Sequence, residues 1–154
     1  SKEDYENLQK RILIEGMLIE MSALIDKLGT DGALEAVRPY AKMSAQAFII
    51  NMNELLRKEG TDVDKIAEAT ELWQILSGNA TGVQEIDAGE DRIIRAGFLN
   101  CPAKSAPKEY CIFVHDMMLN GICETINPEY HCRFTQRITA GDPICSYIIE
   151  KKKE

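Results

Sequence analysis

Apolar side chains recur every three or four positions along the first 28 residues. This spacing places them on one face of an amphipathic helix, so the pattern predicts a helix over residues 2–28. Gly29 follows the last apolar position, and glycine readily adopts the positive φ that ends a helix. The apolar positions are Ile14, Met17, Leu18, Met21, Leu24, Ile25 and Leu28.

Two more helices are predicted before residue 80. The second begins near Asp31 and continues to Gly60, and Pro39 should kink or divide it, because proline lacks the amide hydrogen that a helix interior uses. The third begins at Thr61, where Asp64 three residues later resembles a capping box. It is expected to end near residue 78.

The pattern changes after residue 83 to short β-rich runs. Residues 83–86 and 92–99 flank a turn-rich linker at 87–91 and predict a hairpin. A helix follows over 107–126 and ends at Asn127-Pro128. Residues 130–138 and 144–150 predict a second hairpin, with its turn at 139–143.

Helices that are separated from hairpins in this way indicate an α+β fold, with an antiparallel sheet packed on helices. The chain of 154 residues has the usual length of one domain, with a helical part at 1–78 and a hairpin, helix and hairpin part at 83–150. No Gly-rich turn joins a strand to a helix, so folds that cradle a phosphate cofactor are not expected.

Charge narrows the range of partners. The formal net charge is −7, which repels phosphate backbones and acidic lipid, so neither nucleic acid nor a membrane is an expected partner. No run approaches the length of a membrane span, and the charged start does not resemble a secretion signal. A cytoplasmic protein is therefore expected. The length of the first helix alone suggests pairing with its copy in a homodimer.

The cysteines are concentrated in the last third of the chain, together with both histidines. One hypothesis is a metal site. Cys111 and His115 are four residues apart on the predicted helix, and Cys132 and Cys145 lie on paired strands where both can point to the face that the helix covers. Thiolate and imidazole ligands of this kind suit zinc.

A second hypothesis uses the same region for nucleophilic chemistry. Cys111 near a helix start, with His115 one turn later, has the surroundings of a reactive thiolate, and Asp116 would orient a base or a substrate amine. Cys101, which precedes a proline, is another candidate nucleophile. The third interpretation is that the thiols are small apolar core residues, as free cysteines often are.

Short motifs follow one another in a defined order between residues 97 and 147. They are Cys101-Pro102, Tyr110-Cys111, Asp116, Asn127-Pro128, Arg133 with Thr135, and Gly141-Asp142 ahead of Cys145. Their order resembles the L-2-amino-thiazoline-4-carboxylate hydrolase-like family over about residues 83–150. The resemblance implies hydrolysis of a small ring or amide-like bond containing nitrogen and sulfur, with Cys101, Cys111, Asp116 and Cys145 at the site and Arg133 pairing with a substrate carboxylate.

The same segment also resembles the 4-vinyl-reductase domain, whose fold is shared with nitric-oxide sensors and a Golgi transport subunit. This likeness implies a protein that binds an apolar small molecule without turnover. In sensors with this domain, three cysteines and a glutamate hold zinc. Here only Cys111 and Cys145 match, so two of the four ligands are missing unless Cys132 or His115 substitutes. This departure favours the hydrolase-like branch. The pocket is expected between helix 107–126 and the sheet, lined by Phe98, Phe113, Met117, Met118, Phe134 and Tyr147.

Overall fold

The structure is a computed structural model that describes residues 2–56, 59–76, 84–89, 92–98, 108–112 and 116–153. The predicted residues Cys101, Phe113 and His115 lie outside these ranges, so their roles stay predictions.

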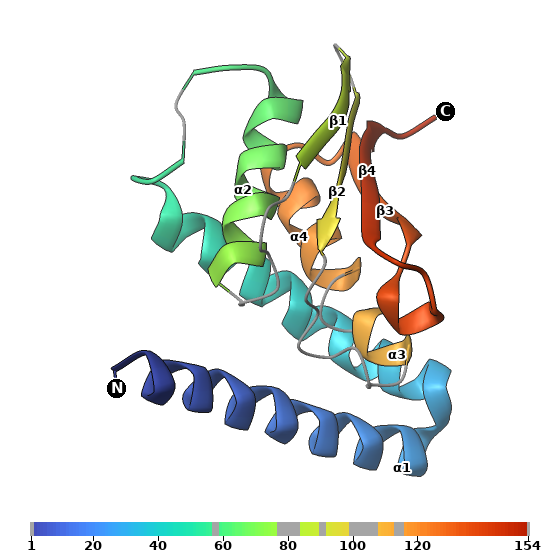
Figure 1. Cartoon of the computed structure of the whole chain (residues 1–154). Coiled ribbons are helices and arrows are strands. Elements are labelled where there is room, and N and C mark those ends of the chain that lie inside the picture. The colour runs from blue at the N-terminus through green and yellow to red at the C-terminus, as the bar shows by residue number, and fades with distance from the viewer. Residues whose placement is uncertain are drawn as a thin grey trace.

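Helix α1 (Lys2–Met52) is two helices joined at one residue. Gly29 has φ 71° and ψ 169°, so it ends the first helix where the sequence predicts. The two halves then lie side by side as a helical hairpin (Figure 1). The prediction that Pro39 divides the helix is wrong, because within α1 only Gly29 leaves the helical region. Glu35 and Pro39 are exposed, so water can bond to the carbonyl that proline leaves unpaired.

Helix α2 (Asp62–Leu76) begins with the predicted capping box. The amide of Thr61 donates to Oδ2 of Asp64 at 3.0 Å, and the amide of Asp64 donates to Oγ1 of Thr61 at 3.3 Å. Each side chain thus satisfies a backbone donor that the start of a helix leaves unpaired.

Four antiparallel strands form one sheet in the order β1-β2-β4-β3. They are β1 (Gln84–Gly89), β2 (Arg92–Phe98), β3 (Tyr130–Gln136) and β4 (Cys145–Lys151). The fold is therefore α+β, as the sequence indicates. The first turn is shorter than predicted, because β1 runs through Asp87 to Gly89 and pairs with β2 after an irregularity between Glu85 and Asp87.

The predicted helix 107–126 is found in the residues of this span that the structure describes. Its described parts are α3 (Lys108–Cys111) and α4 (Met117–Ile126), and residues 113–115 between them lie outside the described ranges. Asp116 precedes α4 at the N-cap position without a side-chain hydrogen bond to the helix. Its carboxylate instead contacts Arg137 of the β3–β4 hairpin, and no local sequence pattern predicts this contact.

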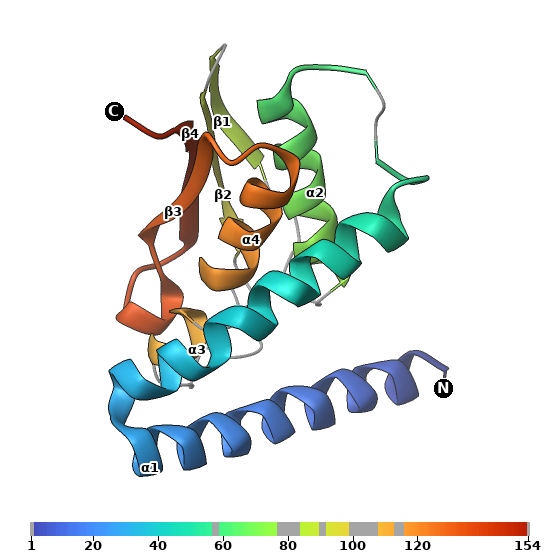
Figure 2. The same ribbon diagram turned by 180° about the vertical axis from the view of Figure 1, so that it is seen from behind.

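Helices α2 and α4 cover one face of the sheet, and the second half of α1 packs against the far side of α4 (Figure 2). The first half of α1 is the outermost layer. At the α1–α4 crossing, a Cβ atom built on Gly121 would lie only 2.7 Å from Cβ of Ala45, so the backbones approach closely there. Between α4 and the sheet lies the core, which includes Leu119, Ile122, Cys123, Tyr147 and Ile149.

Within the described residues, no helix combines the length and the apolar character needed to cross a bilayer.

Candidate functional site

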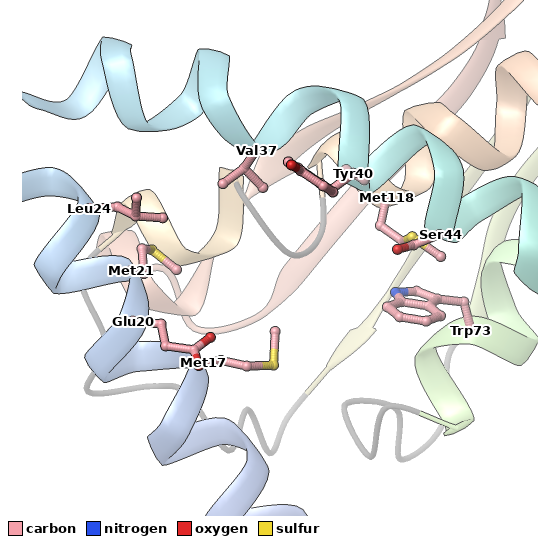
Figure 3. A pocket seen from close by; sticks show the side chains of 10 residues that line it. Met17, Glu20, Met21, Leu24, Val37, Tyr40, Ser44, Trp73 and Met118 are labelled. Atoms are coloured by element: carbon pink, nitrogen blue, oxygen red, sulfur yellow. The ribbon is translucent and has the colours of Figure 1, made fainter. Parts of the chain in front are cut away.

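A cavity of about 260 Å³ lies between the two halves of α1 and reaches α2 and α4. Figure 3 shows Met21 and Leu24 at one end and Trp73, Met118 and Ser44 at the other. Most of its wall is apolar, and three of the lining residues are methionines, whose flexible side chains adapt to differently shaped ligands. The described lining residues are Met17, Glu20, Met21, Leu24, Val37, Tyr40, Ala41, Ser44, Trp73 and Met118.

Trp73 supplies a polar atom to this apolar wall. Phe48 meets its ring edge to face, with centroids 5.6 Å apart, which holds the ring in place. The indole Nε1 is buried and has no hydrogen-bond partner among the described residues. A buried N–H usually has an acceptor, so this atom is a candidate contact for a ligand that carries one.

This cavity is not where the sequence analysis placed the pocket. The space between α4 and the sheet is filled by packed core side chains, including Leu119 and Tyr147, which are fully buried. Met118 is the one predicted pocket residue among those described as lining the cavity, and it does so from the side of α4 that faces α1. Met17 and Met21 come from the first half of α1, outside the segment where the sequence analysis placed the pocket.

A second cluster of functional groups surrounds Arg137, at the end of β3. Its Nη2 donates to Oδ2 of Asp116 at 2.6 Å, with side chains only 21% and 27% exposed. The guanidinium also stacks 4.7 Å from the centre of the Phe134 ring. Asp142 accepts a 2.7 Å hydrogen bond from the Arg137 amide, which shapes the turn after β3. Nη1 of Arg137 and Oδ1 of Asp116 are buried without described hydrogen-bond partners.

Two predicted thiols join this cluster. Sγ of Cys111 lies 3.0 Å from Oγ1 of Thr139, and Sγ of Cys145 accepts a hydrogen bond of 3.3 Å from the amide of Ile138. Cys111 also interacts with the guanidinium of Arg137. Asp116, Cys111 and Cys145 are therefore gathered around one short turn, although they come from three separate elements.

The cluster is electrostatically coupled. Burial raises the pKa of the Asp116 carboxyl above its usual value, and the hydrogen bond and charge of Arg137 offset part of that effect. Burial disfavours the charged form of Arg137, yet the hydrogen bond and charge of Asp116 outweigh it and raise the pKa of Arg137. Burial also raises the pKa of Cys145, so this thiol is protonated near neutral pH.

The proposed metal set does not assemble. Cys132 and Cys145 share the helix-facing side of the sheet, but Cys132 pairs with Ile149, four residues along β4 from Cys145. At about 3.3 Å per residue this separation is roughly 13 Å, too far for one metal ion. In the part of the chain that the structure describes, no three His, Cys, Asp or Glu side chains form a metal-binding group.

Cys132 and Cys123 are packing residues of the core. Both are buried, and burial raises the pKa of Cys123 to about 12 and that of Cys132 well above its usual value. The side-chain amide of Asn120 bonds both the amide and the carbonyl of Cys132, at 2.9 and 2.8 Å, and so attaches α4 to β3. These two thiols remain neutral and enclosed.

The remaining predicted ligand contacts fall in other places. Arg133 lies on the opposite face of β3 from Cys132 and donates to Oε1 of Glu150 at 2.7 Å. The rings of Phe134 and Tyr147 contact each other at a tilt of 46°, with centroids 5.5 Å apart, and Arg137 lies over the Phe134 ring. Phe98 is the last residue of β2 and pairs with Cys145 in the backbone ladder.

Sequence reasoning missed Arg137, Thr139 and most of the cavity wall. A basic residue directly before a turn that ends in Gly141-Asp142 was the only local signal for Arg137. The cavity has no local signal, because its wall comes from helices that meet only after the chain turns back at Gly29.

The comparisons with known proteins concern the fold. No family model matches the sequence, and no curated protein does. Among solved structures, the phenol-responsive sensory domain of the transcription activator PoxR with phenol has a TM-score of 0.67 and 12% identity, over 88% of this chain and 73% of that one. A trafficking protein particle complex subunit 3 from Naegleria fowleri, covalently bound to palmitic acid, has a TM-score of 0.64 and 11% identity, over 96% and 97% of the two chains. These likenesses show a shared α+β fold.

Proposed function

We propose that this protein binds an apolar small molecule in the cavity between the halves of α1. The observation that carries the proposal is the cavity itself, about 260 Å³ and lined mainly by apolar side chains. Its polar groups are few, as in most small-molecule sites, and they include the unpartnered Nε1 of Trp73. Two solved structures with this fold contain phenol and covalently bound palmitic acid, which supports the same use of the fold here.

The single tryptophan provides a direct test, because it lines the cavity. The neutral apolar dye N-phenyl-1-naphthylamine is expected to bind with saturation and to accept energy from excited Trp73. Val37→Phe adds a ring to the wall and should weaken dye binding about tenfold by filling the space.

The matched control is Ala23→Phe, which adds the same ring to an exposed position of the first helix that does not line the cavity. It should leave dye affinity unchanged. Equal weakening by both variants, or no saturable binding to the parent protein, would show that the cavity is not the binding site.

A second candidate function is ring hydrolysis at the Arg137 cluster, and the convergence of Cys111, Asp116 and Cys145 favours it. The free Nη1 of Arg137 would hold a substrate carboxylate. Sγ of Cys111 would add to the ring carbon between nitrogen and sulfur, and its proton would pass to the ring sulfur as that bond breaks. Water would then displace Sγ, so one water is consumed for each ring opened.

Incubation with 2-amino-thiazoline-4-carboxylate tests this second function, since opening the ring releases a thiol that can be titrated. Cys111→Ser should abolish thiol release. Cys123→Ser, at a fully buried cysteine of the core, should retain it once folding is confirmed by circular dichroism. No thiol release from the parent protein would exclude this function and leave ligand binding as the use of the fold.

A further inference from the structure

The outer face of the second half of α1 carries a regular apolar stripe. Its positions are 36, 40, 43, 47 and 50, which alternate steps of four and three as in a coiled-coil seam. All five residues are exposed, with Tyr40 at 68%, Met43 at 63% and Ile50 at 74% of their surfaces. We call this stripe, consisting of Ala36, Tyr40, Met43, Ala47 and Ile50, the α1 seam.

The α1 seam lies on a helix whose other faces already pack against the rest of the protein. Ala41 and Ala45, on the inner side of the same helix, are buried, Ala45 within the main core. Val37 faces the first helix, in the smaller cluster that contains Met21 and Ala33. Exposed apolar residues are therefore also present on the outer face of this helix, where Tyr40 borders the cavity. Large apolar stripes of this kind usually mark an interaction surface.

The residues beside the α1 seam indicate what covers it. The flanking positions nearest a facing helix are Val37, Pro39, Ser44, Gln46 and Asn51, none of which is charged. A partner recognised by its charge would need opposite charges at these positions, and there are none. Because the flanking positions are uncharged, two copies of the chain can meet along the α1 seam with no like charges in contact, although each copy has a net charge of −7.

The sizes of the seam residues also suit a second copy. In an antiparallel pair with a two-fold axis at Met43, Ile50 lies opposite the partner's Ala36, and Tyr40 lies within one residue of the partner's Ala47. Ile50 and Tyr40 then lie near small side chains and Met43 meets its own copy at the axis, so the same surface is used by both chains, as in an isologous interface. The seam spans fourteen residue steps, about 21 Å of helix.

We propose that two copies of this protein pair antiparallel along the α1 seam. The pairing uses the second half of α1 and does not require a bound ligand. Sedimentation equilibrium of the full chain should therefore give twice the monomer mass of 17.3 kDa. Met43→Glu places two carboxylates at the axis and should weaken dimerisation at least about tenfold. Arg38→Glu, at an exposed position on the opposite side of the heptad, should not.

Crosslinking tests the geometry separately from the mass. Met43→Cys should form a disulfide between copies under mild oxidation by copper phenanthroline, because both Met43 side chains meet at the axis. Glu35→Cys, exposed on the same helix but away from the seam, should not. A monomer at every concentration, a dimer that survives Met43→Glu, or equal crosslinking of the two cysteine variants would each overturn the proposal.

Discussion

Replacement of Gly121 by alanine is expected to lower the free energy of unfolding by about 2 kcal/mol. The added Cβ would lie 2.7 Å from Cβ of Ala45, and neither atom belongs to a side chain that can rotate away. The helices α1 and α4 would have to separate, which disturbs the packing of the main core. Urea denaturation followed by circular dichroism measures the change.

The same substitution at Gly16 is expected to change the stability in the opposite direction. It lies in the first half of α1, and a Cβ there would meet nothing within 4 Å. Gly16→Ala should therefore stabilise the protein by up to about 1 kcal/mol through helix propensity alone. Ala45→Gly combined with Gly121→Ala should recover much of the lost stability. An unchanged unfolding midpoint for Gly121→Ala alone would disprove the close approach.

Arg137→Gln should destabilise the protein by about 2 kcal/mol, because it leaves the partly buried Asp116 carboxylate without its counter-charge. The matched control is Arg133→Gln, which breaks an ion pair in which the arginine is 51% exposed. That change should cost less than about 1 kcal/mol. Equal losses for the two variants would show that the Arg137 pair is no more important than a surface pair.

The pH dependence separates this loss from a packing defect. The pKa of Asp116 is raised above 3.8 in the folded protein, so the folded state binds more protons than the unfolded state above that pH, and stability falls as pH rises through this window. In Arg137→Gln the offsetting effect of Arg137 is absent, so the window extends to higher pH. The difference between variant and parent should therefore grow from about pH 4 towards neutrality, and a difference independent of pH would point to packing.

Local chemistry predicted those elements whose boundaries depend on nearby residues. Gly29 ends a helix because its backbone takes a positive φ, and Thr61 and Asp64 cap the next helix through contacts three residues apart. Pro39 misled the prediction because a missing hydrogen bond at an exposed position is a small cost inside a long, well-packed helix. The contact of Asp116, at the start of α4, with Arg137 was not predicted, because the two residues are far apart in sequence.

The candidate sites were predictable only in part. Strand periodicity correctly placed Cys132 and Cys145 on one face of the sheet, but their separation depends on register, which spacing alone does not give. Cys111, Asp116 and Cys145 do gather, around an arginine that no motif indicated. The cavity depends on how two helix halves pack after the turn at Gly29, and periodicity identifies a helix face without identifying what it faces.

The first half of α1 supplies Met17, Glu20, Met21 and Leu24 to the cavity wall, yet it contributes none of the buried residues of the main core. The residues that keep the domain folded and the residues that shape this side of the cavity are therefore largely separate sets. Substitutions at Met17 and Glu20, the two exposed positions among these four, can accumulate without unfolding the sheet and its covering helices. Under the proposed function, ligand preference is thus free to diverge among descendants of this sequence while their architecture is retained.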